Sequence, residues 1–220
     1  MSYWWLFAFC AGSYLIGTIN FSVIISKYVL KSDVRQKGSG NPGASNMLRN
    51  YGKKWGLVIM LTDALIKGAI PALVGVLVYG NGYNPHPLQA VSNSAGQIAL
   101  FACGLASVLG HCFPVWSKFR GGKGMGSLVG VFIVANPALG LCGWIIWMLL
   151  IKVMGNAAVP TFILLTTMVL WEMFLKSPNL VVMIILTVIY FLIIFTHRSN
   201  LYRILRGAEH RIVKVKKKTN

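Results

Sequence analysis

Three short polar segments of this sequence combine glycine with hydroxyl, amide and cationic side chains, and each lies at the end of an apolar run. They are residues 38–46 (Gly-Ser-Gly-Asn-Pro-Gly-Ala-Ser-Asn) with Arg49 close behind, residues 119–124 (Phe-Arg-Gly-Gly-Lys-Gly) and residues 197–200 (His-Arg-Ser-Asn). Glycine permits the positive φ angles that turn successive N–H groups toward one point, and Ser, Asn and Arg side chains add donors. This combination predicts a site for phosphate or a similar anion.

The elements that must position these segments are membrane helices. Hydrophobic residues make up 56% of the 220 residues and only 4 residues are acidic. Several apolar runs approach the ~20 residues that cross a bilayer as a helix. We therefore expect an all-α, polytopic integral membrane bundle that forms a single domain over residues 1–220. The clearest predicted spans are residues 4–26, 55–80, 94–114, 156–175 and 179–196.

The apolar block 125–151 is either one long helix or a hairpin of two short helices. Asn136-Pro137 marks the potential break, because proline lacks a backbone donor and disfavours helical geometry in the residue before it. A hairpin gives about seven transmembrane helices, two of them short. A re-entrant block gives five spans, and one long helix gives six.

Charge placement decides between these topologies, since excess Lys and Arg mark the cytoplasmic side. Lys and Arg number seven in residues 27–54, three in residues 117–123, eight from Arg198 onward and none in residues 81–93. All three basic segments lie inside only if an even number of crossings separates Lys123 from His197. Seven spans satisfy this, with the N-terminus outside. Five spans with a re-entrant block keep the same parity, whereas six spans place the eight positive charges of the tail outside. The basic tail also has a simple alternative role in binding anionic lipid headgroups.

Nucleotide and metal sites are not expected. Gly38, Gly40 and Gly43 satisfy G-x-G-x-x-G, but no buried strand precedes them as a dinucleotide fold requires. The Gly122-Lys123 pair lacks both the first glycine and the Ser or Thr of a nucleotide P-loop. The four cysteines show no C-x-x-C pairing, so neither a zinc site nor a disulfide is predicted. Turn formation alone remains an alternative reading of both glycine segments.

The third segment has helical spacing. His197, Asn200 and Arg203 are successive i,i+3 neighbours on a continuing helix, so all three are predicted to face one site. Asp63 and Lys67 are the only opposite charges inside a span and lie four residues apart, which is compatible with a structural ion pair or with a polar cavity. His111 is interpreted as a helix-end residue.

At these segments the chain resembles the bacterial acyl-phosphate:glycerol-3-phosphate acyltransferases, small polytopic enzymes that begin membrane phospholipid synthesis. The resemblance covers nearly the whole chain. It rests on three ordered motifs, which are residues 38–46 with Arg49, then Gly110-His111 and Pro114 leading to residues 119–124, then residues 197–200 with Arg203, Gly207 and Glu209.

The resemblance implies transfer of a fatty acyl group from acyl phosphate to the 1-hydroxyl of glycerol 3-phosphate, giving lysophosphatidic acid and phosphate. It implies no cofactor and no metal, a bacterial plasma-membrane location with cytoplasmic active-site loops, and the enzyme that makes acyl phosphate as a candidate partner. The implied catalytic residues are Ser39, Lys123 and His197. The implied substrate-binding residues are Gly38, Gly40, Asn41, Gly43, Ser45, Asn46, Arg49, Gly121, Gly122, Asn200 and Arg203.

The chain departs from the family pattern at three places. Ser45 replaces a usual Thr, Met-Gly-Ser at 125–127 replaces a more common Val-Ala-Thr, and Asp63 and Lys67 are one residue further apart than usual. The general base is left open between His197 and a phosphate oxygen of the substrate. A transporter or channel for phosphate-bearing solutes is the alternative of another class. A lipid phosphatase is a weaker alternative, because no nucleophile with a paired base is evident.

Overall fold

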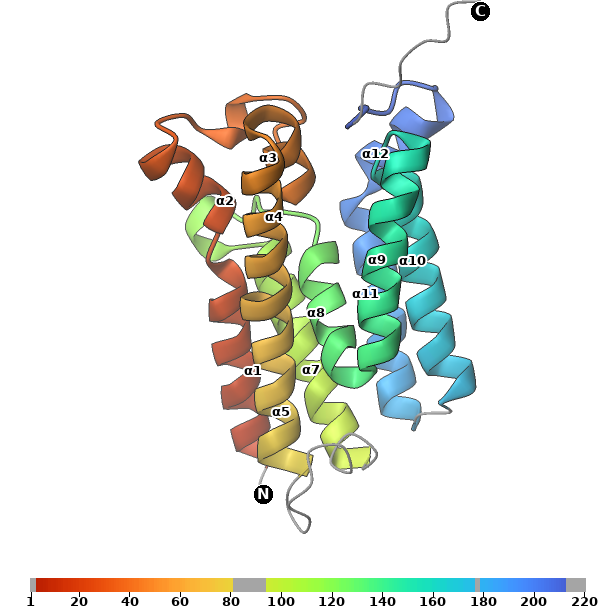
Figure 1. Cartoon of the computed structure of the whole chain (residues 1–220). Coiled ribbons are helices and arrows are strands. Elements are labelled where there is room, and N and C mark those ends of the chain that lie inside the picture. Colours follow the sequence, from red (N-terminus) through yellow and green to blue (C-terminus); the bar gives the residue numbers. More distant parts are fainter. Residues whose placement is uncertain (1–2, 81–93, 177–178, 213–220) are drawn as a thin grey trace, which may run out of the picture.

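The computed structural model describes residues 3–80, 94–176 and 179–212, and every regular element in these ranges is a helix (Figure 1). The apolar layer is built from α1 (Tyr3–Thr18), α4 (Lys53–Thr62), α5 (Ile70–Gly80), α7 (Ser94–Cys112), α8 (Met125–Ala135), α9 (Pro137–Met154), α10 (Ala158–Leu170) and α11 (Leu180–Thr196). The π-helical segment η3 (Asp63–Ala69) joins α4 to α5 as one rod, and η5 (Trp171–Leu175) extends α10. The predicted all-α membrane bundle is confirmed.

Five continuous helical stretches of the described residues are long and apolar enough to cross a membrane: Trp4–Val29, Lys53–Tyr79, Ser94–Ser117, Pro137–Met154 and Ala158–Leu175. A sixth is the bent pair Leu180–Thr196 and Arg198–Leu205. The seventh apolar helix, α8, has only 11 residues, and at 1.5 Å per residue it reaches about half of a bilayer core.

The predicted break at Asn136-Pro137 is present. Asn136 leaves helical geometry, and its side-chain oxygen accepts a hydrogen bond from the Leu139 N–H at 3.1 Å, while Pro137 occupies the first turn of α9. The expectation that both helices of this hairpin are short is wrong for α9, which has 18 residues. Its apolar run continues to Met154 and ends only at Gly155, whose positive φ of 71° forms the C-cap.

The core lies where α5, α7, α8, α10 and α11 meet. Leu100, Phe132, Leu165 and Leu186 are fully buried there, and Phe101 packs edge-on against Phe132 with ring centroids 6.0 Å apart. Close approach of α1 and α7 depends on glycine, because a Cβ at Gly110 would overlap the Tyr14 carbonyl of α1. Many large apolar side chains outside this core are exposed, as expected of a surface that faces lipid.

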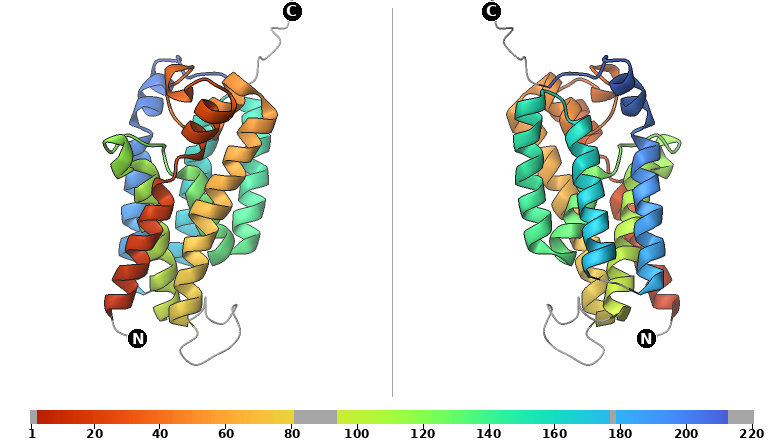
Figure 2. Two further views of the ribbon diagram at one scale, coloured as in Figure 1. Left: turned by 90° about the vertical axis from the view of Figure 1, so that its left-hand side faces the viewer. Right: turned by 90° about the vertical axis from the view of Figure 1, so that its right-hand side faces the viewer.

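A polar cap covers one end of the bundle, and the three predicted motifs all lie in it or at its base (Figures 1 and 2). The cap contains α2 (Phe21–Ile24), η1 (Ile25–Val29), η2 (Val34–Gln36), α3 (Ala44–Tyr51), η4 (Val115–Ser117) and α12 (Arg198–Leu205). Val34, Met47 and Ile59 form a small buried cluster that fixes α3 against α4. The N-terminal end of α1 lies at the opposite end of the bundle (Figure 1). Residues 81–93 and 213–220, for which opposite sides of the membrane are predicted, lie outside the described residues.

Candidate active site

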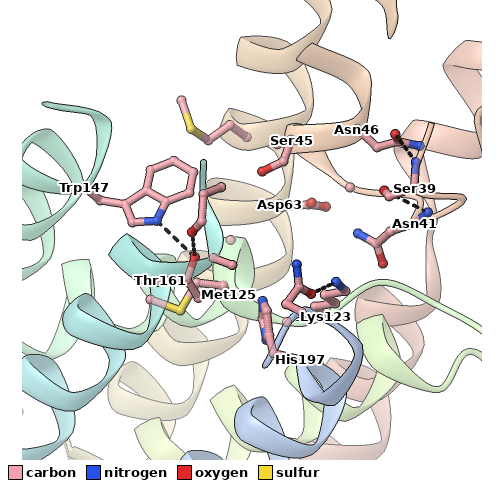
Figure 3. A pocket seen from close by; sticks show the side chains of 18 of the residues that line it. Ser39, Asn41, Ser45, Asn46, Asp63, Lys123, Met125, Trp147, Thr161 and His197 are labelled. Atoms are coloured by element: carbon pink, nitrogen blue, oxygen red, sulfur yellow. Dashed lines mark hydrogen bonds between the residues drawn. The ribbon is translucent and has the colours of Figure 1, made fainter. Parts of the chain in front are cut away.

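The three motifs line one cavity of about 110 Å³ beneath the polar cap (Figure 3). The predicted site residues on its wall are Ser39, Asn41, Gly43, Ser45, Asn46, Arg49, Lys123, His197, Asn200 and Arg203. A wider cleft of about 710 Å³ adjoins it, shares Ser39, Asn41, Lys123 and Arg203 with it, and includes Gly40 and Gly121. Gly38 and Gly122 line neither cavity; Gly38 packs against Asn46, and Gly122 packs against His111. Segments more than 150 residues apart in the sequence thus meet at one place.

The first loop is shaped by its own backbone hydrogen bonds. The Ser39 N–H donates to Asn46 Oδ1 at 3.1 Å, the Gly40 N–H to the Lys37 carbonyl at 3.0 Å, and the Gly43 N–H to the Asn41 carbonyl at 3.0 Å. Positive φ angles at Gly38 and Gly40, 57° and 70°, make this course possible. These amides are therefore occupied within the chain, and the side chains of Ser39, Asn41 and Ser45 remain to face the cavity (Figure 3).

Asn46 organises this loop from the first turn of α3. Its side chain is almost fully buried, accepts from Ser39, and donates to the carbonyls of Val34 and Lys37 at 3.1 and 3.0 Å. Ser45 lies beside it at the N-terminus of α3, where first-turn N–H groups and the helix dipole favour an anion.

Arg49 lies one turn further along α3. Its Nε donates to the Arg211 carbonyl at 3.2 Å, which ties α3 to the end of the described chain. Burial lowers the pKa of Arg49, yet an arginine remains charged in a protein. The Arg49 guanidinium thus contributes a positive charge to the wall of the cavity.

The second loop folds back onto the end of α7. The Gly121 and Gly122 N–H groups donate to the carbonyls of Cys112 and His111, both at 3.0 Å. These carbonyls belong to the last turn of α7, which has no further helical partners for them. The two glycines thus shape the loop and leave Lys123 as the group that enters the cavity (Figure 3).

Lys123 is the central cation of the cavity. Its Nζ donates to Asn200 Oδ1, and its carbonyl accepts from Thr196 Oγ1 at 2.9 Å. Burial, followed by the nearby Arg203 charge, lowers the pKa of Lys123 to about 8. An anion in the cavity would restore a stable ammonium, since opposite charge favours the protonated form.

Glu209 connects the neighbouring groups of the third motif. Its two carboxylate oxygens accept from Asn200 Nδ2 at 2.9 Å and from Arg203 Nε at 3.1 Å. The Asn200 side chain therefore accepts a hydrogen bond from Lys123 through its oxygen and donates one to Glu209 through its nitrogen. Three cationic side chains, Lys123, Arg49 and Arg203, line this cavity together with two carboxylates, Glu209 and Asp63. Asp63 is itself paired with Lys67 at 3.0 Å, so the balance favours phosphate.

His197 stands at the junction of α11 and α12. The expectation of a continuing helix is wrong, because the two helices are bent by 57° there and His197 forms the N-cap of α12. His197, Asn200 and Arg203 still line the same cavity, as their spacing predicts. His197 Nδ1 lies 2.9 Å from the Ile193 carbonyl, which can only accept, so Nδ1 carries the proton. A neutral ring then presents Nε2 as an acceptor.

The cavity also has an apolar wall that sequence reasoning missed. Its side chains come from α4, α9 and α10 and include Met60, Trp144, Trp147, Thr161 and Leu164. Trp147 Nε1 donates to Thr161 Oγ1 at 3.1 Å, and Trp144 Nε1 lies 3.1 Å from Met60 Sδ. The two tryptophans are i,i+3 neighbours, but in an apolar membrane helix this spacing does not separate a cavity wall from a lipid-facing surface.

Comparisons with known proteins agree on one family. The family model described as glycerol-3-phosphate acyltransferase matches residues 7–207. The glycerol-3-phosphate acyltransferase of Mycoplasmopsis pulmonis is 36% identical, with 92% of this chain and 91% of that protein covered. The enzyme of the same name from Aquifex aeolicus is also 36% identical, with 90% and 95% covered.

Two solved structures are similar to this chain. Both are of PlsY (YgiH), described as an integral membrane glycerol 3-phosphate acyltransferase, and both are 32% identical over 94% of each chain. The glycerol 3-phosphate form gives a TM-score of 0.80, and the lysophosphatidic acid form gives 0.78.

Proposed function

The chain belongs to the glycerol-3-phosphate acyltransferase family, and we propose that its acyl donor is an acyl phosphate. The enzyme transfers a fatty acyl group to glycerol 3-phosphate and so forms lysophosphatidic acid, the first step of phospholipid synthesis. The observation that carries the donor proposal is the meeting of several cations and an apolar wall in one cavity.

An acyl phosphate suits this cavity because its leaving group needs little besides charge stabilisation. Cations already in place lower the energy of the departing phosphate without reorganisation. The acceptor also carries a phosphate, so both substrates match a site bordered by Arg49, Lys123 and Arg203. Neither a nucleotide nor a metal ion is needed to activate a mixed anhydride of this kind.

The polar side chains of the first motif bind phosphate oxygens. Ser39, Asn41 and Ser45 supply hydrogen-bonding groups at the cavity wall, and the N-terminus of α3 adds a favourable dipole. Gly38, Gly40, Gly43 and Asn46 keep this loop in shape. Arg49, in the last turn of α3, adds a positive charge to the same wall and binds the phosphate.

In the second and third motifs, Lys123 stabilises the phosphate charge that grows as the anhydride breaks. Asn200 holds the ammonium in place through its side-chain oxygen, and Glu209 in turn fixes the amide of Asn200. Gly121 and Gly122 deliver Lys123 by folding the loop onto α7. Arg203 adds a second charge from the opposite side of Glu209.

In the chemical step, the 1-hydroxyl oxygen of glycerol 3-phosphate attacks the acyl carbonyl carbon. The bond from that carbon to the phosphate oxygen then breaks, which yields lysophosphatidic acid and phosphate. His197 Nε2 accepts a hydrogen bond from the attacking hydroxyl and orients it. The proton leaves to His197 Nε2 or to a phosphate oxygen. A pH–rate profile of His197→Gln separates the two routes, because only the first loses its acidic limb.

The acyl chain lies along Trp144, Trp147 and Leu164, next to the phosphate site. These residues belong to α9 and α10, and α9 exposes most of its remaining apolar side chains to lipid. A donor already dissolved in the bilayer thus reaches the cavity from the apolar side while glycerol 3-phosphate arrives through the polar cap.

The polar cap faces the cytoplasm. It carries the basic segments that the positive-inside rule assigns to that side. Water-soluble glycerol 3-phosphate then enters from the compartment in which it is made. The enzyme that makes acyl phosphate contacts the protein at this same cytoplasmic face.

The donor is tested with purified protein in detergent, labelled glycerol 3-phosphate and a chelator. Acyl phosphate is expected to give labelled lysophosphatidic acid, whereas acyl-CoA at the same concentration gives none. A matched preparation of Lys123→Met controls for contaminating acyltransferases. A strict requirement for acyl-CoA or for a divalent ion contradicts the proposal.

A further inference from the structure

Three buried ionisable side chains form a cluster that the roles given above do not use. Lys67 Nζ lies 3.0 Å from Asp63 Oδ1 and 3.1 Å from His111 Nδ1, and His111 Nδ1 lies 3.7 Å from Asp63 Oδ1. Their side chains are at most 5% exposed. Asp63 and Lys67 come from η3 and His111 from the end of α7, so the cluster joins two membrane helices. Such groups inside a membrane bundle are rarely retained without a function.

The donor and acceptor roles in this cluster follow from chemistry. A lysine ammonium has only donors, so His111 Nδ1 must accept from Lys67 Nζ. His111 is therefore neutral, and its ring proton sits on Nε2. The Asp63 carboxylate balances the Lys67 charge at the same time. The cluster carries no net charge, and each charged side chain has a partner, as burial requires.

His111 supports the second loop with both its backbone and its ring. Its carbonyl accepts the Gly122 N–H at 3.0 Å. Its ring lies against the Cα of Gly122, where any added Cβ would overlap Nε2. Gly121 packs in the same way, since a Cβ there would lie 2.5 Å from Pro114 Cδ and 2.8 Å from the Cys112 carbonyl oxygen. The orientation of the His111 ring thus sets the position of Gly122 and, through it, the backbone position of Lys123, the next residue.

Asp63 and Lys67 lie four residues apart, a spacing that places both side chains on one face of a helix, and they pair within the π-helical segment η3. A π-turn accommodates one more residue than an α-turn, and η3 spans Asp63–Ala69. The Lys67 carbonyl accepts a hydrogen bond from Ser107 Oγ of α7. This hydrogen bond ties η3 to the helix that carries His111.

We propose that Asp63, Lys67 and His111 form a positioning network that fixes the Gly121–Gly122 segment and thereby places the Lys123 ammonium in the phosphate site. The network acts through Lys123. The inference rests on the proposed function of Lys123 at that site. Displacing a catalytic charge by about 1 Å can lower turnover by about 10², so ring orientation at His111 has a measurable effect.

The test is a double-mutant cycle between His111→Gln and Lys123→Met, read as kcat/KM for glycerol 3-phosphate. His111→Gln alone is expected to lower kcat/KM by about 10–10². In the Lys123→Met background the same change is expected to have less than about a twofold effect, because the group being positioned is already absent. Calorimetric binding of glycerol 3-phosphate gives the same cycle without turnover.

Cys103→Ala is the matched control. Cys103 is fully buried on α7, about two turns before His111, and lines neither cavity. It is expected to keep kcat/KM within about twofold of the wild type. His111→Asn is the second variant and should fall between the wild type and His111→Gln, because its Oδ1 takes the position of the His111 Nδ1 that accepts from Lys67, whereas the glutamine oxygen lies one bond further out.

The outcomes separate cleanly. Equal losses from His111→Gln in both backgrounds overturn the proposal, as does near wild-type activity of His111→Gln. If neither His111 variant gives a folded protein, the cluster is structural and the proposal is also overturned. A wild-type protein that makes no lysophosphatidic acid from acyl phosphate contradicts the proposed donor, a different result from any of these.

Discussion

Replacing Lys123 by methionine separates electrostatic catalysis from folding. The pKa of Lys123 is lowered from its ordinary value of 10.5 to about 8, by burial first and by Arg203 second. At 1.36 kcal/mol per pKa unit, holding this ammonium in the empty site destabilises the folded protein by about 3 kcal/mol. Folding favours the neutral form here, so the penalty applies below pH 8 and fades as the pH rises toward 10.5.

Lys123→Met removes that penalty together with the hydrogen bond to Asn200. The two changes oppose each other, so the melting temperature at pH 7 is expected to stay within a few degrees of the wild type or to rise. Turnover is expected to fall by about 10²–10³, the usual effect of losing one preorganised charge donor. Similar size and apolar stem make methionine a close match for the packing of lysine.

The assay pairs a radiochemical measurement of lysophosphatidic acid with a thermal melt of the same detergent preparation. Lys53→Met is the matched control, because Lys53 is exposed at the start of α4 and a screened surface charge contributes little. Near wild-type turnover of Lys123→Met refutes its role in the site. Loss of turnover together with loss of folding shows that Lys123 is needed for folding, and refutes a purely electrostatic role.

Three further outcomes follow from the same geometry. The kcat/KM for glycerol 3-phosphate should fall as the pH rises above about 8, where Lys123 loses its proton. Lys123→Arg should move this fall to a higher pH. If the fall occurs at the same pH in the arginine variant, it does not come from Lys123. Single cysteines at Lys53 and Lys176, in a background without native cysteines, should label from opposite sides of intact cells, whereas labelling of both by an impermeant reagent rejects the orientation. Glu209→Gln should reduce both stability, by about 1.5–3 kcal/mol, and activity, since a charged acceptor for Asn200 is lost; an unchanged melt argues against Glu209 as a structural link.

The sequence is sufficient to predict the membrane bundle and the meeting of its three motifs. Apolar run lengths identify the spans, and Asn136-Pro137 identifies the break between α8 and α9. Charge parity predicts that all three motifs lie at one end, where the structure places them (Figures 1 and 2). These features depend on local composition, which a single sequence displays directly.

Features that depend on contacts between distant segments were not predictable. Four glycine amides of the first two motifs, those of Gly40, Gly43, Gly121 and Gly122, bond to carbonyls of the chain itself. Residue types alone give no sign of which partner an amide takes. The pairing of His111 with Lys67 joins residues 44 positions apart. In the sequence, Trp144 and Trp147 cannot be told from lipid-facing residues. Only the packing of α4 and α10 beside α9 shows that they line the cavity.

The origin of the released phosphate tests the central claim most directly. Wild-type protein is incubated with acyl phosphate labelled at phosphorus and unlabelled glycerol 3-phosphate, and both products are counted. One labelled inorganic phosphate is expected for each lysophosphatidic acid formed, and the lysophosphatidic acid itself should carry no label. Labelled lysophosphatidic acid, or labelled phosphate released without formation of lysophosphatidic acid, would contradict acyl transfer from acyl phosphate.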